Sequence, residues 1–219
     1  MVLEVKNYQL VSMKFTGFDP FIAHHVFYAD FITNDGSSYP IPFYFFNGKV
    51  PIWSFEKVVA DPCFNMPFSI MVKEIAAKMN AAVFKTEASD EKVESLITAI
   101  NKDIEDDEVF WKIIALGMTN NKKALPALKK LVEHDDRFIR GCALSAIGTL
   151  GAVDEFTFLK EHYEKFKEVD KYLAFKSIGD LAYLGSQEAK DYIAQVIKLP
   201  KDDKSLAVLN YLDNVYKLK

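Results

Sequence analysis

Few residues in this sequence have the types and spacing that site chemistry would need. The strongest metal candidate is the adjacent pair His24-His25, with Asp19 and Asp30 nearby. Neighbouring residues on an extended strand point to opposite faces, so two adjacent imidazoles cannot easily bind one ion. No spacing singles out either carboxylate as a further ligand. We therefore expect no metal site.

The cysteines add little catalytic chemistry. A nucleophilic thiol needs a neighbouring base and a lowered pKa, and the residues around Cys63 specify neither. With Cys142 it makes two cysteines, too few for a disulfide framework and without metal-ligand spacing. The sequence contains no glycine-rich phosphate loop, serine-nucleophile elbow or dinucleotide fingerprint. We expect no catalytic residue and no cofactor, which favours a binding protein over an enzyme.

The charge balance argues against nucleic acid as a partner. The 219 residues carry a formal net charge of −4, and residues 87–219 hold 24 acidic and 20 basic side chains. Binding to a phosphate backbone needs a concentrated basic face, whereas the only arginines are Arg137 and Arg140. No stretch approaches the roughly 20 apolar residues that cross a bilayer, and the N-terminus lacks a signal-peptide layout. These observations predict a cytoplasmic protein with no membrane or nucleic-acid partner.

The elements that must position any binding residues follow a 34-residue repeat. The dipeptides Leu116-Gly117, Leu150-Gly151 and Leu184-Gly185 recur at that interval, each at the end of an apolar, helix-periodic run. A repeat of this length is typical of stacked helical hairpins. In each run, apolar residues three and four apart form one buried stripe. Each glycine is expected to end its helix in the left-handed conformation.

A polar turn and a second amphipathic helix follow each glycine. Asn121 and Asp154 are expected to cap second helices, and Pro126 falls in a first turn, where its missing N–H does no harm. Upstream, Pro67–Phe84 and Asp90–Ile104 predict an earlier, less regular pair of helices. A last helix is expected at about 204–217.

The best-defined repeat, residues 116–150, resembles a known family. Leu116-Gly117, Ala124-Leu125-Pro126-Ala127-Leu128 and the run from Asp135 to Arg140 are similar to the HEAT-like repeat first described in phycobilin lyases. That family's pattern is Leu-Gly, then Ala-Val-Pro-x-Leu, an Asp, and a Val-Arg that begins the next repeat. The likeness is partial over 151–184. A tetratricopeptide array shares the period but expects a tyrosine where Asn120, Asp154 and Glu188 stand.

The resemblance implies a mainly α fold, with a HEAT-like α-solenoid of helical hairpins over residues 67–219. It also implies a structural role for Asp136 and Arg140 in a ladder that joins neighbouring repeats, with Asp170 in the register of Asp136. A phycobilin-lyase-like enzyme or chromophore-binding protein is the alternative function that the resemblance brings, and binding of DNA lesions is a third. Some HEAT-like enzymes bind di-iron through His-Glu pairs, but here the order is reversed, in Glu133-His134 and Glu161-His162.

Residues 1–66 have a different composition and predict a small β-containing cap. Twelve of the 18 phenylalanines and six of the eight prolines precede residue 87. Asn47-Gly48 and Asn34-Asp35-Gly36 lie between β-prone runs and predict hairpin turns in an antiparallel sheet of three or four strands. The prolines place their strands at an edge, because proline cannot donate a ladder hydrogen bond; they are Pro40, Pro42 and Pro51.

The aromatic residues of this cap have two interpretations. Burial against the helices is favoured, since a terminal repeat must hide its apolar face. An exposed patch for a partner is the alternative. The residues concerned are Phe43, Phe45, Phe46, Trp53 and Phe55.

Two surfaces of the repeat region are candidates for binding a protein. Acidic residues recur between successive hairpins, where they cap helices, and stacking would also align them as an acidic ridge. The residues of this ridge are Asp106, Asp107, Asp135, Asp136, Asp170, Asp202 and Asp203. Second helices line the concave face in this class of fold, and their outward residues mix charge with tyrosine, as protein-recognition surfaces do. These include Lys122, Lys129, Lys130, Glu161, Glu164, Lys165, Lys190 and Asp191, with Tyr163 and Tyr192 among them.

The sequence thus favours a non-enzymatic scaffold, adaptor or inhibitor that holds a protein partner with a basic surface. A toxin-neutralising, immunity-type protein is one form of this hypothesis, because small acidic proteins can mask basic active sites.

Overall fold

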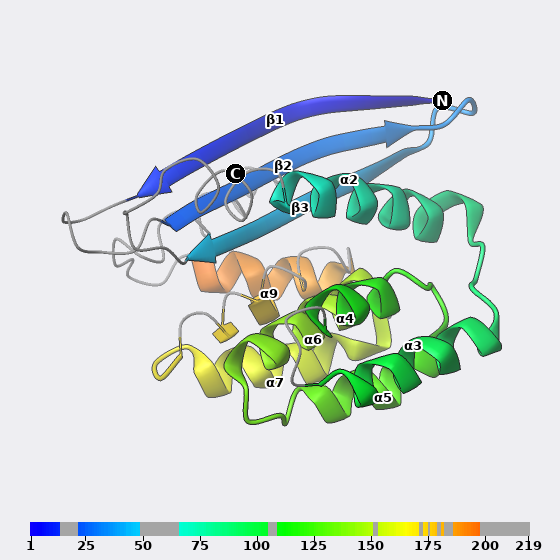
Figure 1. Ribbon diagram of the computed structural model, residues 1–219. Helices are drawn as coiled ribbons and strands as arrows, with labels where there is room; N and C mark the ends of the chain where they lie inside the picture. The colour runs from blue at the N-terminus through cyan, green and yellow to red at the C-terminus, as the bar shows by residue number, and fades with distance from the viewer. Residues whose placement is uncertain are drawn as a thin grey trace, which may run out of the picture. The chain divides into compact units, whose positions relative to one another are not determined.

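Three strands at the N-terminus and a series of helices after them make up the protein (Figure 1). The computed structural model describes residues 1–13, 22–48, 66–104, 109–150, 153–170, 173–174, 176–178, 181 and 186–197. The chain divides into two compact units, Met1–Met79 and Asn80–Lys219. Several predicted features lie outside the described residues: Pro51, Trp53, Phe55, Cys63, Asp106, Asp107, Gly151, Leu184, Gly185, Asp202, Asp203 and the last helix.

The first unit is built on an antiparallel sheet with the strand order β1-β2-β3. Its strands are β1 (Val2–Met13), β2 (Ile22–Ile32) and β3 (Ser38–Gly48). The predicted turn at 34–36 joins β2 to β3, and Gly36 adopts a φ of 83°, which costs little without a side chain. Pro40 and Pro42 lie in β3, an edge strand of this sheet, as their lack of an N–H predicts.

A β-bulge in β1 changes which residues share a face. Leu3 lies opposite Phe31 and Val5 opposite Ala29, but the register shifts between Val5 and Asn7, so that Tyr8 lies opposite Phe27. Lys6 is therefore the extra residue of the bulge. Because directly opposed residues point to the same face, Leu3, Val5 and Tyr8 all belong to the face of the buried β2 residues.

Helix α2 (Met66–Met79) covers this apolar face of the sheet on the β3 side. Ile70, Met71 and Ile75 are buried on the helix, and Ile41 and Phe43 are fully buried on β3. Phe43 thus follows the burial interpretation of the cap's aromatic residues. We expected the cap to end near residue 66, whereas this packing places α2 with the sheet, in the unit that ends at Met79.

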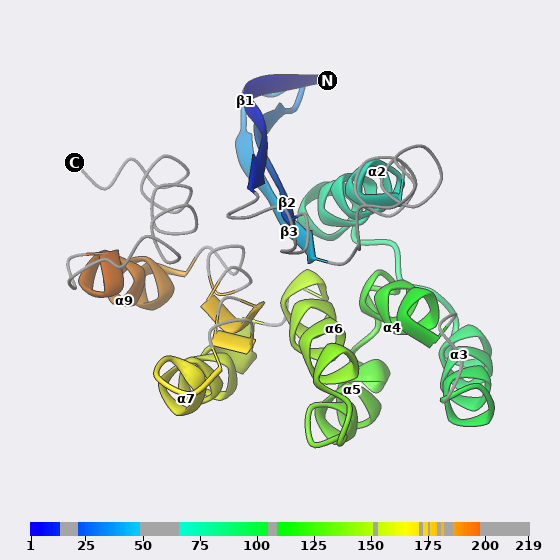
Figure 2. The ribbon, with the colours of Figure 1, turned by 60° about the vertical axis from the view of Figure 1, so that its left-hand side comes forward.

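The described part of the second unit is made of helices. They are α3 (Asp90–Lys102), α4 (Val109–Gly117), α5 (Leu125–Leu131), α6 (Arg137–Thr149), α7 (Phe156–Phe166) and α9 (Gln187–Ile197). Short 3-10 turns precede α5 and α7, at Lys122–Ala124 and Val153–Glu155. In Figure 2, α4 lies beside α6, with α3 next to α4 and α5 next to α6, and α9 lies near α7.

The 34-residue register predicts the buried stripe of the first helices correctly. Ile113, Ile147 and Leu181 occupy equivalent positions and are all fully buried, and Leu116 and Leu150 are buried before their turns. Spacings of three and four place such residues on one side of each helix, where neighbouring helices exclude water from them. Burying one such side chain, instead of leaving it exposed, stabilises the folded state by about 1.5–3 kcal/mol.

Gly117 is required for a reason other than the predicted helix end. It lies within α4, and the left-handed residue of this turn is Asn120, with a φ of 53°. A Cβ added at Gly117 would lie 2.6 Å from the Cα and 2.8 Å from the carbonyl oxygen of Ala146 in α6. The expectation of a left-handed glycine at this position is therefore wrong: the absence of a side chain lets two helix backbones approach closely.

We predict that Gly117→Ala destabilises the second unit by about 1–3 kcal/mol, because its methyl group would push α4 away from α6. Urea denaturation followed by circular dichroism measures the change. The double variant Gly117→Ala, Ala146→Gly is the control. It should recover only part of the stability, since it removes the Ala146 Cβ at 2.7 Å but leaves the backbone Cα at 2.6 Å and the carbonyl oxygen at 2.8 Å. Full recovery would show that the conflict involves only the two methyl groups.

Candidate functional site

Polar residues in the turns link each helix pair to the next at intervals of about one repeat. Asn121 caps its own 3-10 turn by accepting a hydrogen bond from the Lys123 amide at 3.0 Å. Its Nδ2 donates to the Ala88 carbonyl oxygen at 2.9 Å and to Asp90 Oδ1 at 3.0 Å, in the preceding repeat. Lys123 also pairs with Asp90. The predicted cap is confirmed, and the same side chain joins two repeats.

The next link is made by lysines of the α5 segment. Lys129 pairs with Glu155 at 2.7 Å, and Lys122 pairs with Asp154 at 3.2 Å. Glu155 is only 7% exposed, whereas Lys122 and Asp154 are both mostly exposed, so the Lys129–Glu155 pair is the better shielded from water and salt. Asp154 lies inside the 3-10 turn, and no side chain caps α7, so the predicted capping role of Asp154 is wrong.

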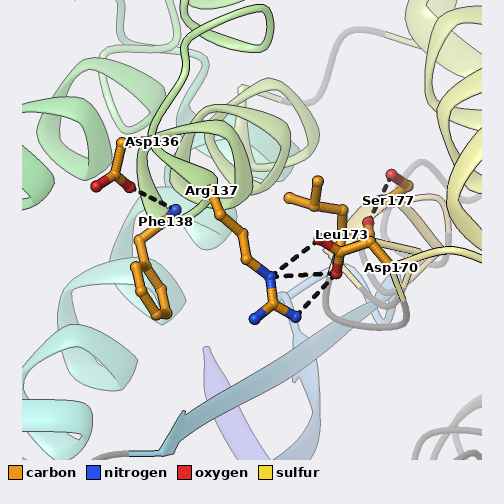
Figure 3. Close-up of polar contacts among 6 residues, drawn as sticks. All are labelled: Asp136, Arg137, Phe138, Asp170, Leu173 and Ser177. Carbon is orange, nitrogen blue, oxygen red and sulfur yellow. Dashed lines mark hydrogen bonds and ion pairs between the residues drawn. The ribbon is translucent and has the colours of Figure 1, made fainter.

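A bidentate ion pair links the following two repeats, as Figure 3 shows. Arg137 Nε and Nη2 each lie 2.9 Å from an oxygen of the Asp170 carboxylate, and Nε also lies 3.3 Å from the second oxygen. Asp170 Oδ1 in addition accepts a hydrogen bond from the Leu173 amide at 3.2 Å. The planar guanidinium fork matches a carboxylate in a way that a lysine ammonium cannot.

Asp136 and Arg140 act locally. The Asp136 carboxylate caps α6 by accepting hydrogen bonds from the Phe138 amide at 2.6 Å and the Ile139 amide at 3.1 Å (Figure 3). Arg140 donates to the carbonyl oxygens of His134 at 2.9 Å and Asp135 at 3.1 Å. The ladder that the resemblance implied for these two residues is instead made by Arg137, three residues before Arg140, together with Asp170.

An open groove lies between α7 and α9. Its volume is about 310 Å³, and it is lined by Phe156, Lys160, Glu188, Asp191, Tyr192 and Gln195. The rings of Phe156 and Tyr192 meet edge to face at 6.1 Å between centroids. Lys160 Nζ lies 4.8 Å from the centroid of Tyr192 and 5.7 Å from that of Phe156, within the range of cation–π attraction.

Glu164 holds one wall of the groove in place. The Tyr192 hydroxyl donates a hydrogen bond to Glu164, and Lys167 pairs with the same carboxylate at 2.7 Å. Both hydrogen bonds lower the pKa of Glu164, and that of Lys167 has the larger effect. Burial raises the pKa of Tyr163 to about 12 and also raises that of Tyr192, so both phenols stay protonated at neutral pH.

The predicted partner-binding residues have different degrees of access. Tyr163 is only 8% exposed and belongs to the core, while Lys129 and Glu164 are held by ion pairs within the protein. Lys130 and Glu161 are exposed on the second helices. On the predicted acidic ridge, Asp135 and Asp136 are exposed, and Asp170 is paired with Arg137. Most of the described acidic residues between hairpins therefore act in capping or ion pairs.

The sequence placed Asp191 and Tyr192 of this groove on the outward side of a second helix, but it did not single out Lys160, Gln195 or Arg137. The 33-residue separation of Arg137 and Asp170 is a signal that could have paired them, since it is one residue short of the repeat. Tyr192 and Glu164 are 28 residues apart, and no periodicity marks that pair.

The histidines of the second unit make hydrogen bonds within their own segments. His162 Nδ1 lies 2.8 Å from the Phe158 carbonyl oxygen, and His134 Nδ1 accepts a hydrogen bond from the Asp136 amide at 3.0 Å. In the parts of the chain that the structure describes, no three or more metal-ligating side chains gather to hold an ion. None of the helices described there is long and apolar enough to cross a membrane.

Comparison with known proteins identifies the repeat region. The sequence profile of a family described as HEAT repeats matches residues 93–179. The match supports HEAT-like repeats in this part of the chain, and the N-terminal part has no family match. No curated protein and no solved structure matches the chain.

We predict that the two roles of Asp170 can be separated by substitution. Arg137→Ala and Asp170→Asn both remove the ion pair. Each leaves an oxygen on the side chain of residue 170 that can accept from the Leu173 amide, so each should lower the unfolding free energy by about 0.5–1 kcal/mol. Asp170→Ala also removes the cap of Leu173 and should cost about 1–2 kcal/mol. Urea denaturation measures all three. Equal losses for Asp170→Asn and Asp170→Ala would contradict the capping role.

Cys142 is predicted to be an inert thiol. Burial raises its pKa to about 11, and the positive charge of Lys176 opposes this only in part. In a Cys63→Ser variant, an aromatic disulfide reagent at pH 8 should label no thiol until the protein is unfolded. The folded state opposes ionisation of this thiol, whereas the unfolded state lets it ionise near pH 9. The thiol therefore has no effect on the free energy of unfolding below pH 9 and lowers that free energy as the pH rises toward 11. Fast labelling of the folded protein would contradict the assignment.

Proposed function

We propose that the second unit is a short α-solenoid that binds a protein partner along its second helices. HEAT repeats commonly mediate protein–protein interaction, and the family match supports a scaffold of this kind. The links at Asn121, Lys129 and Arg137 each join one repeat to the next, as the stacked units of a solenoid require.

The groove between α7 and α9 is the observation that carries the choice of surface. The rings of Phe156 and Tyr192 are only 5% and 8% exposed and form a rigid apolar base, and the exposed carboxylates Glu188 and Asp191 stand beside it. The side chains that a partner can reach here are therefore mainly polar and charged, as in the rim of a protein interface. Four of the six lining residues are polar or charged, a composition suited to a protein surface rather than to a tetrapyrrole.

The charges of the groove favour a basic segment of the partner. A lysine or arginine side chain entering beside Glu188 and Asp191 would meet two exposed carboxylates. Exposed carboxylates also speed the encounter with a basic protein, and added salt weakens that effect. Inhibition of a basic enzyme or toxin is the finer form of this proposal, and the identity of the partner would decide it.

Charge reversal in the groove tests the proposal. We predict that Glu188→Lys, Asp191→Lys weakens capture of the partner by about tenfold or more at low salt, because it replaces attraction by repulsion. The measurement is affinity capture from an extract of the source cells, with quantitative mass spectrometry over a range of salt concentrations. The control, Glu87→Lys, Glu94→Lys, makes the same charge change at exposed positions away from the groove.

A protein that the wild type and the control retain and the groove variant loses would support the proposal. Equal retention by all three would exclude this groove as the binding surface. If no protein is enriched at any salt concentration, the scaffold function itself is contradicted.

A further inference from the structure

The groove between α7 and α9 has walls of opposite charge. Lys160 comes from α7, whereas the carboxylates Glu188 and Asp191 come from α9. Among the residues that the structure describes, no carboxylate oxygen lies within 4.0 Å of Lys160 Nζ. The charges of the two walls therefore do not pair with each other, and both line the open groove.

The Lys160 ammonium is held at the base of the groove by aromatic rings rather than by an anion. Its Nζ lies 4.8 Å from the ring centroid of Tyr192 and 5.7 Å from that of Phe156. Such contacts hold a cation in place, but they leave its three N–H donors without oxygen acceptors. Within the described part of the chain, no atom accepts a hydrogen bond from Lys160. An acceptor from a partner can therefore bind these donors.

Glu164 is the acidic residue one helical turn beyond Lys160 on α7, at a spacing that favours an ion pair on a helix. Its carboxylate is engaged instead by Lys167 at 2.7 Å and by the Tyr192 hydroxyl. Because Glu164 is held in this way, Lys160 remains a positive charge at the base of the groove.

The carboxylates of α9 are accessible on the opposite wall. Glu188 and Asp191 are both exposed, and Glu188 makes no hydrogen bond or ion pair with any described residue. Asp191 accepts one hydrogen bond, from Gln187 Nε2 at 2.8 Å. An ionised carboxylate has about four acceptor positions, so both residues can still receive a basic side chain.

A uniformly basic segment fits this groove poorly. Its first cation would meet the carboxylates of α9, but a second one beside it would face Lys160, where the rings already hold a cation. Repulsion of this kind separates the correct partner from other basic chains. A segment with one basic and one acidic side chain meets a complementary charge on each wall.

We propose that the groove recognises a protein segment from which a basic and an acidic side chain project on the same side. The basic side chain pairs with Glu188 and Asp191, and the acidic one pairs with Lys160. This inference rests on the proposed function and specifies the charge pattern of the partner. Packed helices lie about 8–10 Å apart, so the two side chains must be close in sequence. They are three or four residues apart on a helix, or two apart on a strand.

Selection of peptides on the full chain tests this charge pattern. A display library of random linear peptides is enriched in parallel on the wild type, on Lys160→Glu and on Glu188→Lys, Asp191→Lys. Peptides that the last variant fails to bind are those that depend on the groove. On the wild type they should carry the basic–acidic pair, and on Lys160→Glu a second basic residue should replace the acidic one. Uniformly basic peptides on the wild type would overturn this inference and leave the proposed function standing, whereas the absence of any groove-dependent peptide would contradict both.

Fluorescence anisotropy with the best wild-type peptide measures the contribution of Lys160. Lys160→Met should weaken binding about three- to fivefold, the effect of one partly exposed ion pair. Lys160→Glu should weaken it by about tenfold or more, because attraction becomes repulsion. If the bound segment presents no acidic side chain to Lys160, both substitutions will strengthen binding instead, and the inference is then wrong. A peptide with lysine in place of its acidic residue should bind Lys160→Glu better than the wild type.

Lys92→Met and Lys92→Glu are the matched controls, because they make the same charge changes at an exposed lysine of α3. They should bind the peptide as the wild type does, and circular dichroism shows whether each variant is folded. Equal weakening by the Lys92 and Lys160 variants would contradict a specific contact. Free lysine carries an amine and a carboxylate in one small molecule and serves as a competitor. If it displaces the peptide at the peptide's own concentration, the groove binds a small zwitterion and the proposal is overturned.

Discussion

The second unit depends on the close approach of α4 to α6. Neither helix can bury its apolar stripe alone: Ile113 and Ile147 are fully buried, and the two backbones approach closely at Gly117 and Ala146. A packed interior tolerates little change in volume, so this contact fixes the separation of the first helices. The links at Asn121, after α4, and at Arg137, at the start of α6, come from residues next to these two helices. Packing therefore decides where the charged residues meet.

Charged and polar residues of the turns cap helices and join neighbouring repeats, a role that the net charge of −4 does not indicate. Asp136 satisfies amides at the start of α6, Asp170 combines a cap with an ion pair, and Asn121 reaches back to the preceding repeat. Free N–H groups at a helix start attract carboxylates, and the same oxygens can accept from a neighbouring guanidinium. Glu188 and Asp191 in the groove take no part in these links between repeats, and Asp191 accepts a hydrogen bond from the Gln187 side chain at 2.8 Å.

Periodicity made most of the repeat region predictable. The 34-residue spacing identified the buried positions of the first helices and the resemblance to HEAT repeats, because burial imposes the same apolar residues at each turn. The cap at Asn121 and the turn at Gly36 were also predictable, since both depend on local chemistry. The reason for Gly117 was not, because it depends on a neighbour 29 residues away. The groove was missed because Tyr192 and Glu164 come from different repeats without a common register.

The links between repeats have an evolutionary consequence. Each one joins only adjacent units: Asn121 reaches residues 88 and 90, and Arg137 reaches Asp170. An inserted or deleted segment of one full period would meet the same kinds of neighbour on both sides, whereas a change of a few residues would misalign every link after it. The chain can thus lengthen or shorten by duplication or loss of whole repeats, and the length of its helical surface would change in steps of one helix pair.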